Sequence, residues 1–150
     1  MLGVVAVSIH GHEVGDGVML AMGRRLHELT AAAGGVYRVG GDEFAVVLEG
    51  CADGPTAVAF AERLVEAVQA PFARSELPDD SAQMSGDRVT ASIGVALAGN
   101  RSTPNGLLVR ADFASWGAKG KWGGTRGDRV VLFDDLPLMA RQQADGGEEE

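Results

Sequence analysis

The sequence predicts one α/β domain, an α+β sandwich in which helices flank a central mixed five-stranded sheet. Short runs rich in β-branched residues alternate with longer segments whose apolar residues have helical spacing. Two of the short runs are separated only by Gly40–Glu43, a connection typical of a β-hairpin. The chain has 150 residues, of which 45% are hydrophobic, so it can bury a substantial core.

The expected strands follow from their apolar patterns. The first is a continuous run of apolar residues, which predicts a strand that is buried on both faces. The fourth alternates apolar and smaller residues and should have one strongly apolar face. The five strands are expected at Val4–Ile9, Val36–Val39, Phe44–Leu48, Val89–Leu97 and Arg129–Phe133.

Three helices are expected between these strands. Asp16 is placed to cap the first helix, and Gly34-Gly35 is placed to end it. The second is capped by Asp53, has Pro55 in its first turn and stops before Pro71. The third runs from Thr103-Pro104 to about Lys119. The inward stripes are Val18, Met22, Leu26 and Leu29 in the first helix, Ala57, Ala61, Leu64, Val65 and Val68 in the second, and Leu107, Leu108, Ala111 and Ala118 in the third.

The remaining segments are polar. Residues 73–88 lack periodicity and are interpreted as a surface loop. Residues 135–150 end in several acidic residues and are expected to form a disordered tail outside a domain that covers residues 1–134.

Charge and cysteine content limit the partners and the compartment. The net charge of -8 argues against nucleic acid as a partner, although a local cluster of donors can still bind a small anion. Cys51 is the only cysteine, so an internal disulfide is impossible, which fits a reducing cytoplasm. The apolar N-terminal run is too short to span a bilayer and lacks a basic leader, so no membrane association is expected.

Four motifs occur in a fixed order along the chain. They are GHEVGD at residues 11–16, RVGGDEF at residues 38–44, VTASIGVA at residues 89–96, and ADFASWGAK followed by DRVVLF between residues 111 and 133. Together they resemble the GGDEF-domain family of diguanylate cyclases over about Val4–Asp134. The resemblance implies condensation of two GTP molecules into cyclic di-GMP, with release of pyrophosphate.

The GGDEF hairpin supplies the candidate catalytic and metal-binding residues. By resemblance, Asp42 is a metal ligand, and Glu43 is a second acid that binds metal or helps to deprotonate the attacking 3′-hydroxyl. Both carboxylates are expected to be exposed at the hairpin tip beside the end of the first strand. Mg²⁺ or Mn²⁺ is the implied cofactor, because a triphosphate approaches carboxylates only when a cation neutralises it. Gly40 and Gly41 are implied in substrate binding, since backbone without side chains allows close approach of the nucleotide.

Two further substrate contacts rest on resemblance. Asp16 matches the carboxylate that accepts hydrogen bonds from the guanine edge, and this role is compatible with helix capping. Lys119 matches a lysine that binds phosphate; alternatively, it is a solvated cation near a helix C-terminus. The family's arginine four residues later is Gly123 here, which leaves Arg126 as a candidate substitute.

The chain departs from the family pattern before GHEVGD. About a dozen family residues are absent there, including the first-strand metal aspartate and an asparagine that binds guanine. Ser8, Ile9 and His10 occupy the region, and none is a carboxylate. A second alignment treats Val4–Ile9 as a remnant of the helix, and it supplies no aspartate either. His10 and His12 are interpreted as loop residues rather than a metal-binding pair.

The family's product-inhibition motif, Arg-x-x-Asp, is also missing, because Ala31 and Gly34 stand at its positions. Two hypotheses remain open. The chain is either a diguanylate cyclase with impaired turnover, which requires a homodimer because catalysis in the family needs two facing half-sites, or an inactive regulatory module that binds GTP or a protein partner.

Overall fold

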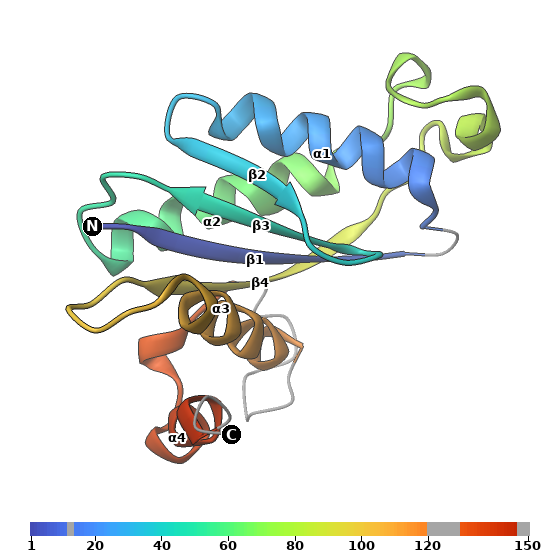
Figure 1. Cartoon of the computed structure of the whole chain (residues 1–150). Helices are drawn as coiled ribbons and strands as arrows, with labels where there is room; N and C mark the ends of the chain where they lie inside the picture. Colours follow the sequence, from blue (N-terminus) through green and yellow to red (C-terminus); the bar gives the residue numbers. More distant parts are fainter. Residues whose placement is uncertain (12–13, 120–129, 147–150) are drawn as a thin grey trace.

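The computed structural model describes residues 1–11, 14–119 and 130–146, which form a mixed five-stranded sheet with flanking helices (Figure 1). The strand order is β2-β3-β1-β4-β5, and only the β4–β5 pair is parallel. The predicted fold class is therefore confirmed. The strands are β1 (Gly3–His10), β2 (Gly34–Arg38), β3 (Glu43–Leu48), β4 (Thr90–Leu97) and β5 (Val130–Leu132).

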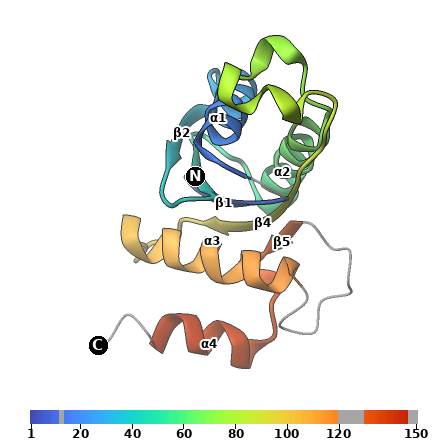
Figure 2. The ribbon, with the colours of Figure 1, turned by 90° about the vertical axis from the view of Figure 1, so that its right-hand side faces the viewer.

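The helices lie in layers on the two faces of the sheet. α1 (Asp16–Thr30) and α2 (Gly54–Gln69) cover one face, α3 (Pro104–Ala118) covers the other, and α4 (Leu138–Gly146) lies on the outer side of α3 (Figure 2). β1 is central and is enclosed by an apolar cluster on each side, as its unbroken apolar run predicts. The strand assignment of Val4–Ile9 is correct, and its reading as a helix remnant is wrong.

Side-chain caps fix the starts of two helices where the sequence places them. The Asp53 carboxylate accepts a hydrogen bond from the Thr56 N–H at 2.8 Å, and α2 begins at the next residue, Gly54. Thr103 caps α3 in the same way. The expected inward stripes are buried, except that Leu29 and Leu108 are only partly buried.

Both predicted ends of α1 are wrong. Gly15 is the N-cap and makes no side-chain cap bond, while Asp16 is the first helical residue. Gly34 and Gly35 belong to β2 instead of ending the helix. The glycine at position 34 is required for close packing of strands, since a Cβ there would overlap the Val47 carbonyl oxygen at 1.7 Å.

Two polar segments are more ordered than their sequences predict. Residues 73–88 contain the 3-10 turns η1 (Arg74–Glu76) and η2 (Asp79–Met84), and this segment buries Leu77 and Met84. The predicted disorder from residue 135 is wrong as far as residue 146: after the short turn η3 (Phe133–Asp135), α4 buries Ala140 and Ala144 beside α3. These alanines are four residues apart and form one face of a short helix. Residues 147–150 lie outside the described residues.

Within the described ranges, no helix combines the length and apolarity needed to cross a bilayer.

Candidate functional site

The tip of the β2–β3 hairpin lies beside the end of the central strand β1 (Figure 1). The Ile9 N–H donates to the Asp42 carbonyl oxygen at 2.8 Å, and Ser8 is the register partner of Glu43. The predicted position of Asp42, exposed at the tip beside this strand end, is confirmed. Because β1 is buried on both sides, it gives the turn a rigid support.

A single arginine joins the turn to the start of α1. The Arg38 Nε donates to the Gly40 carbonyl oxygen at 3.3 Å, and its Nη2 donates to the Gly41 carbonyl oxygen at 2.8 Å. The same Nη2 donates to Asp16 Oδ1 at 2.9 Å. Arg38 was not among the predicted site residues, although it lies only two positions before Gly40, the first glycine of the turn. Asp16 is thus linked to the turn through Arg38.

The two glycines of the turn are not required by the described chain itself. Neither has a left-handed backbone conformation. A Cβ at Gly40 would meet only the Glu43 Cβ, at 3.6 Å, and a Cβ at Gly41 would have no neighbour within 4 Å. The missing side chains therefore leave the backbone of the turn open to a ligand.

Glu43 is half-buried, so the prediction that it is exposed is wrong. Burial is the main cause that raises its pKa, to about 7; a hydrogen bond with the Asp112 carboxyl group and repulsion from that group and from Asp42 contribute, while Lys119 acts in the opposite direction. Asp112 belongs to α3 and was missed as a site residue. The sequence held one indication of this role. Asp112 precedes Lys119 by seven residues, or two helical turns, which places both on one face of the helix.

The raised pKa of Glu43 predicts a pH dependence of stability without metal. Between pH 4.5 and about 7, folded Glu43 holds a proton that the unfolded chain releases, so the free energy of unfolding should fall as pH rises through this window. Urea unfolding at several pH values, with chelator present, measures this slope. Glu43→Gln should flatten it, whereas Glu49→Gln, at an exposed loop position, should leave it unchanged. Equal slopes in all three proteins would contradict the assignment.

Lys119 and His10 complete the cluster around the turn. Lys119 follows the last residue of α3, and its charge acts on both Glu43 and His10. The His10 Nε2 lies 2.9 Å from Ser92 Oγ. Burial first, and then Lys119, lower the pKa of His10, against an opposing effect of Asp42. The structure thus brings Asp42, Glu43 and Lys119 together with His10, which is a strand residue rather than the predicted loop residue.

Other sequence predictions cannot be placed. His12, and therefore the His10–His12 pair, lies outside the described residues, as do Gly123 and Arg126.

The carboxylates at the turn suit a hard divalent cation. Asp42 and Glu43 offer oxygen ligands, and Mg²⁺ commonly uses one or two carboxylates together with waters and substrate phosphates. In residues 1–11, 14–119 and 130–146, no group of three or more His, Cys, Asp or Glu side chains is arranged to hold a metal alone. The donor set fits a cation that is shared with a phosphorylated ligand.

The fold and the hairpin define a GGDEF domain. The family described as "Diguanylate cyclase, GGDEF domain" matches residues 8–125. This chain belongs to the GGDEF family.

The relatives include named diguanylate cyclases. Diguanylate cyclase TpbB of Pseudomonas aeruginosa is 35% identical over 136 residues, which cover 89% of this chain and 29% of TpbB. The bifunctional diguanylate cyclase/cyclic di-GMP phosphodiesterase MucR of the same species is 32% identical over 113 residues, which cover 73% of this chain and 15% of MucR. The chain therefore spans less than a third of the length of these relatives.

A solved structure of the GGDEF domain alone of PA1120 (TpbB or YfiN) from Pseudomonas aeruginosa has a TM-score of 0.69 at 30% identity. The match covers 96% of this chain and 81% of that one. The GGDEF domain of DgcB from Caulobacter crescentus, solved with c-di-GMP, has a TM-score of 0.68 at 20% identity, with 89% and 78% covered. The latter likeness supports the fold alone.

Proposed function

We propose that this domain binds GTP together with Mg²⁺ or Mn²⁺ at the tip of the β2–β3 hairpin and condenses two GTP molecules into cyclic di-GMP with impaired turnover. The observation that carries the proposal is the cluster of Asp42 and Glu43 on an open glycine turn, within electrostatic reach of Lys119. The family's named diguanylate cyclases support the same reaction class.

Each side chain has a distinct role in this proposal. Asp42 and Glu43 hold the divalent cation, which when bound offsets the charge of the triphosphate. Lys119 attracts the phosphate groups, and the Gly41 N–H approaches them from the turn. The Gly40 N–H already donates to the Glu43 carbonyl oxygen at 3.3 Å, so Gly40 contributes the space left by its missing side chain. If Glu43 is instead free of the cation, its pKa of about 7 suits it to accept the proton of the attacking 3′-hydroxyl near neutral pH.

Impaired turnover follows from the end of β1. Ser8, Ile9 and His10 offer no carboxylate beside the hairpin tip, so the cation has fewer anionic ligands than two-metal phosphoryl chemistry favours. This observation also supports the second candidate, a GTP-binding or protein-binding regulatory module without turnover. In the first case, we infer a homodimer that brings two GTP-loaded sites face to face.

Equilibrium binding tests the proposed ligand. Calorimetric titration of the chain with GTP in Mg²⁺ or Mn²⁺ should give measurable binding that is lost with chelator. GTP binding that is equally tight with and without the metal, or the absence of GTP binding, would contradict the proposal.

Feedback by the product should be weak or absent at the end of α1. Ala31 caps this helix and Gly34 opens β2, so neither offers the guanidinium that binds a phosphate in two places. Titration with cyclic di-GMP should therefore show no submicromolar binding at this position. Tight binding that is lost when residues around Ala31 are replaced would contradict the prediction.

A further inference from the structure

Arg25 of α1 uses every N–H group of its guanidinium in hydrogen bonds to other parts of the chain. Nε and Nη2 donate to the two carboxylate oxygens of Glu76, at 2.6 and 2.7 Å. Nη1 donates to the carbonyl oxygens of Ala67 and Ala70 at 3.0 and 2.7 Å, and Nη2 also donates to that of Pro71 at 3.0 Å. Carbonyl groups in the last turn of a helix lack helical partners. Arg25 therefore caps α2 and also holds the chain that leaves it.

The chain that leaves α2, residues 71–88, is a loop whose two ends are joined. The Phe72 N–H donates to the Asp87 carbonyl oxygen at 3.0 Å, and the Gly86 N–H donates to the Phe72 carbonyl oxygen at 2.8 Å. The Arg25 guanidinium lies over the Phe72 ring, 4.7 Å from its centroid, and the Arg25 side chain is only 12% exposed. Arg25 and these backbone bonds together fix the ends of the 71–88 segment.

The middle of the 71–88 segment packs against the first turn of α1, where η2 contacts the helix (Figure 1). The contact is closest at Gly17, because a Cβ there would lie 2.1 Å from Ser81 Oγ. Ser81 is buried, and its Oγ is hydrogen-bonded to Asp80 Oδ1 at 3.0 Å. Glycine is a weak helix former, so its presence in the first turn of α1 is accounted for by the close approach of Ser81.

One segment thus holds α1 at two places, Arg25 and Gly17. Asp16 directly precedes Gly17, and its carboxylate accepts the Arg38 bond that links α1 to the hairpin turn. We propose that the 71–88 segment is a positioning element, which sets the first turn of α1 relative to the hairpin so that Asp16 and Arg38 meet. Arg25 follows Asp16 by nine residues, or about 13 Å along the helix, so it acts through the segment and not by touching the ligand. This proposal rests on the proposed GTP binding at the hairpin tip and deepens it.

Arg25→Met keeps the length of the side chain but removes all of its donors. The folded variant should bind GTP with Mg²⁺ about tenfold more weakly than the unaltered chain, because the ligand would meet a displaced α1. Circular dichroism identifies the temperature at which the variant is folded, so a loss of stability alone would leave the dissociation constant unchanged. Arg25→Lys should give an intermediate affinity, since lysine keeps the charge but cannot bind Glu76 at two points.

Hydrogen exchange reports the position of the first turn without any ligand. The Met19 N–H donates to the Gly15 carbonyl oxygen at 3.0 Å, so its exchange should become faster in Arg25→Met. Arg74 is the matched control: it belongs to the same segment, but its ion pair with Asp79 is exposed and does not reach α1. Arg74→Met should leave both GTP affinity and Met19 exchange unchanged.

A pair of substitutions tests the contact at the other end. Gly17→Ala should push η2 away from α1 and weaken GTP binding, although alanine favours the helix itself. Adding Ser81→Gly removes the atoms that the new methyl group would strike, and it should restore the affinity. If the methyl group instead obstructed the nucleotide directly, the second substitution would restore nothing, and the role of the segment would be overturned.

The outcomes separate the two proposals. Folded Arg25→Met that binds GTP as tightly as the unaltered chain, with unchanged Met19 exchange, overturns the positioning role and leaves the proposed GTP site intact. Failure of the unaltered chain to bind GTP with Mg²⁺ or Mn²⁺ overturns both proposals.

Discussion

Asp42→Ala is expected to abolish metal-dependent GTP binding and to lower any formation of cyclic di-GMP by a factor of about a hundred to a thousand. Asp42 is the exposed acid at the hairpin tip, and Glu43 is half-buried and hydrogen-bonded to Asp112. Without Asp42, the cation would depend on Glu43 alone, a half-buried carboxyl group whose pKa is raised mainly by burial. Calorimetry with GTP and Mg²⁺ measures the binding loss, and chromatography of the products measures the rate.

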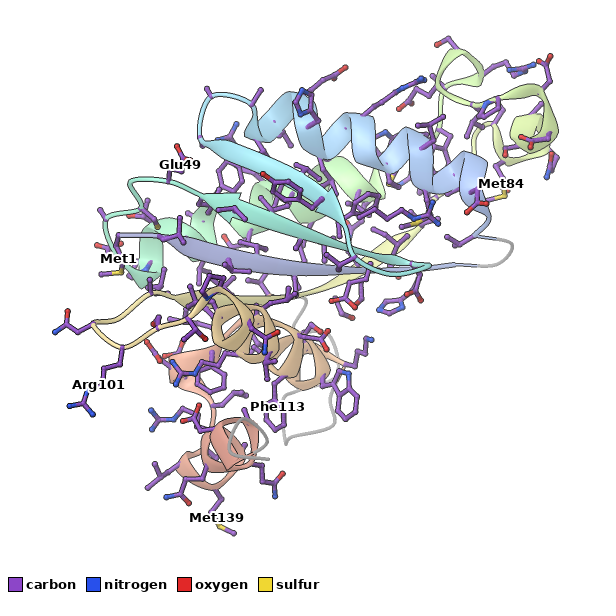
Figure 3. All side chains as sticks on the ribbon, in the orientation of Figure 1. Met1, Glu49, Met84, Arg101, Phe113 and Met139 are labelled. Carbon is purple, nitrogen blue, oxygen red and sulfur yellow. The ribbon has the colours of Figure 1, made fainter. Side chains whose placement is uncertain are left out.

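The matched control for Asp42 is an acidic residue far from the turn. Glu49 is exposed at the other end of the sheet, near Met1 (Figure 3). Glu49→Gln changes the net charge by the same amount and should leave GTP binding unaltered. Equal losses in both variants would indicate a general charge effect and would remove the metal role from Asp42.

Gly94→Ala is expected to cause a large loss of stability. Gly94 lies in β4, where an added Cβ would be 1.9 Å from the Ala111 carbonyl oxygen and 2.3 Å from the Ser115 nitrogen. α3 is therefore packed directly on the backbone of β4, and a methyl group would force the two elements apart. Overpacking typically costs about 1–3 kcal/mol of the free energy of unfolding and occasionally more, and contacts this short place Gly94→Ala at the upper end of that range. Urea denaturation monitored by circular dichroism measures it.

Gly41→Ala is the matched substitution at an open position. No atom lies within 4 Å of the added Cβ, so the free energy of unfolding should not fall. GTP binding should weaken, because the methyl group would stand where the nucleotide approaches the turn. A stability loss as large as that of Gly94→Ala would show that the turn glycine serves the fold instead.

Short-range patterns were sufficient for most of the fold. The continuous apolar run of β1 and the Asp53 cap with Pro55 each depend on residues close in sequence, and they predicted their elements well. The prediction that Gly34 ends the first helix was wrong, because glycine is needed at position 34 for a close contact with Val47 in another strand. The α4 helix was not predicted, because its two buried alanines lie in a polar, acidic segment and their packing beside α3 is not evident from the sequence.

The candidate site likewise contains residues that the sequence predicts and contacts that it does not. Asp42 and Glu43 are adjacent in a recognisable hairpin, so the sequence predicts their position directly. The contact of Asp112 with Glu43 joins α3 to β3, and the bond of Arg38 to Asp16 joins β2 to α1. Neither pairing follows from local spacing, since both depend on how distant elements meet.

Incubation of the unaltered chain with GTP and either Mg²⁺ or Mn²⁺, followed by chromatographic separation of the products, tests the central claim most directly. The site described here predicts metal-dependent GTP binding with very slow or undetectable formation of cyclic di-GMP. Mn²⁺ should support more product than Mg²⁺, because it accepts irregular coordination and a nitrogen ligand such as His10. Turnover with Mg²⁺ at about 1–1,000 per second, the ordinary range of enzymes, would contradict the claim that the site lacks an essential carboxylate.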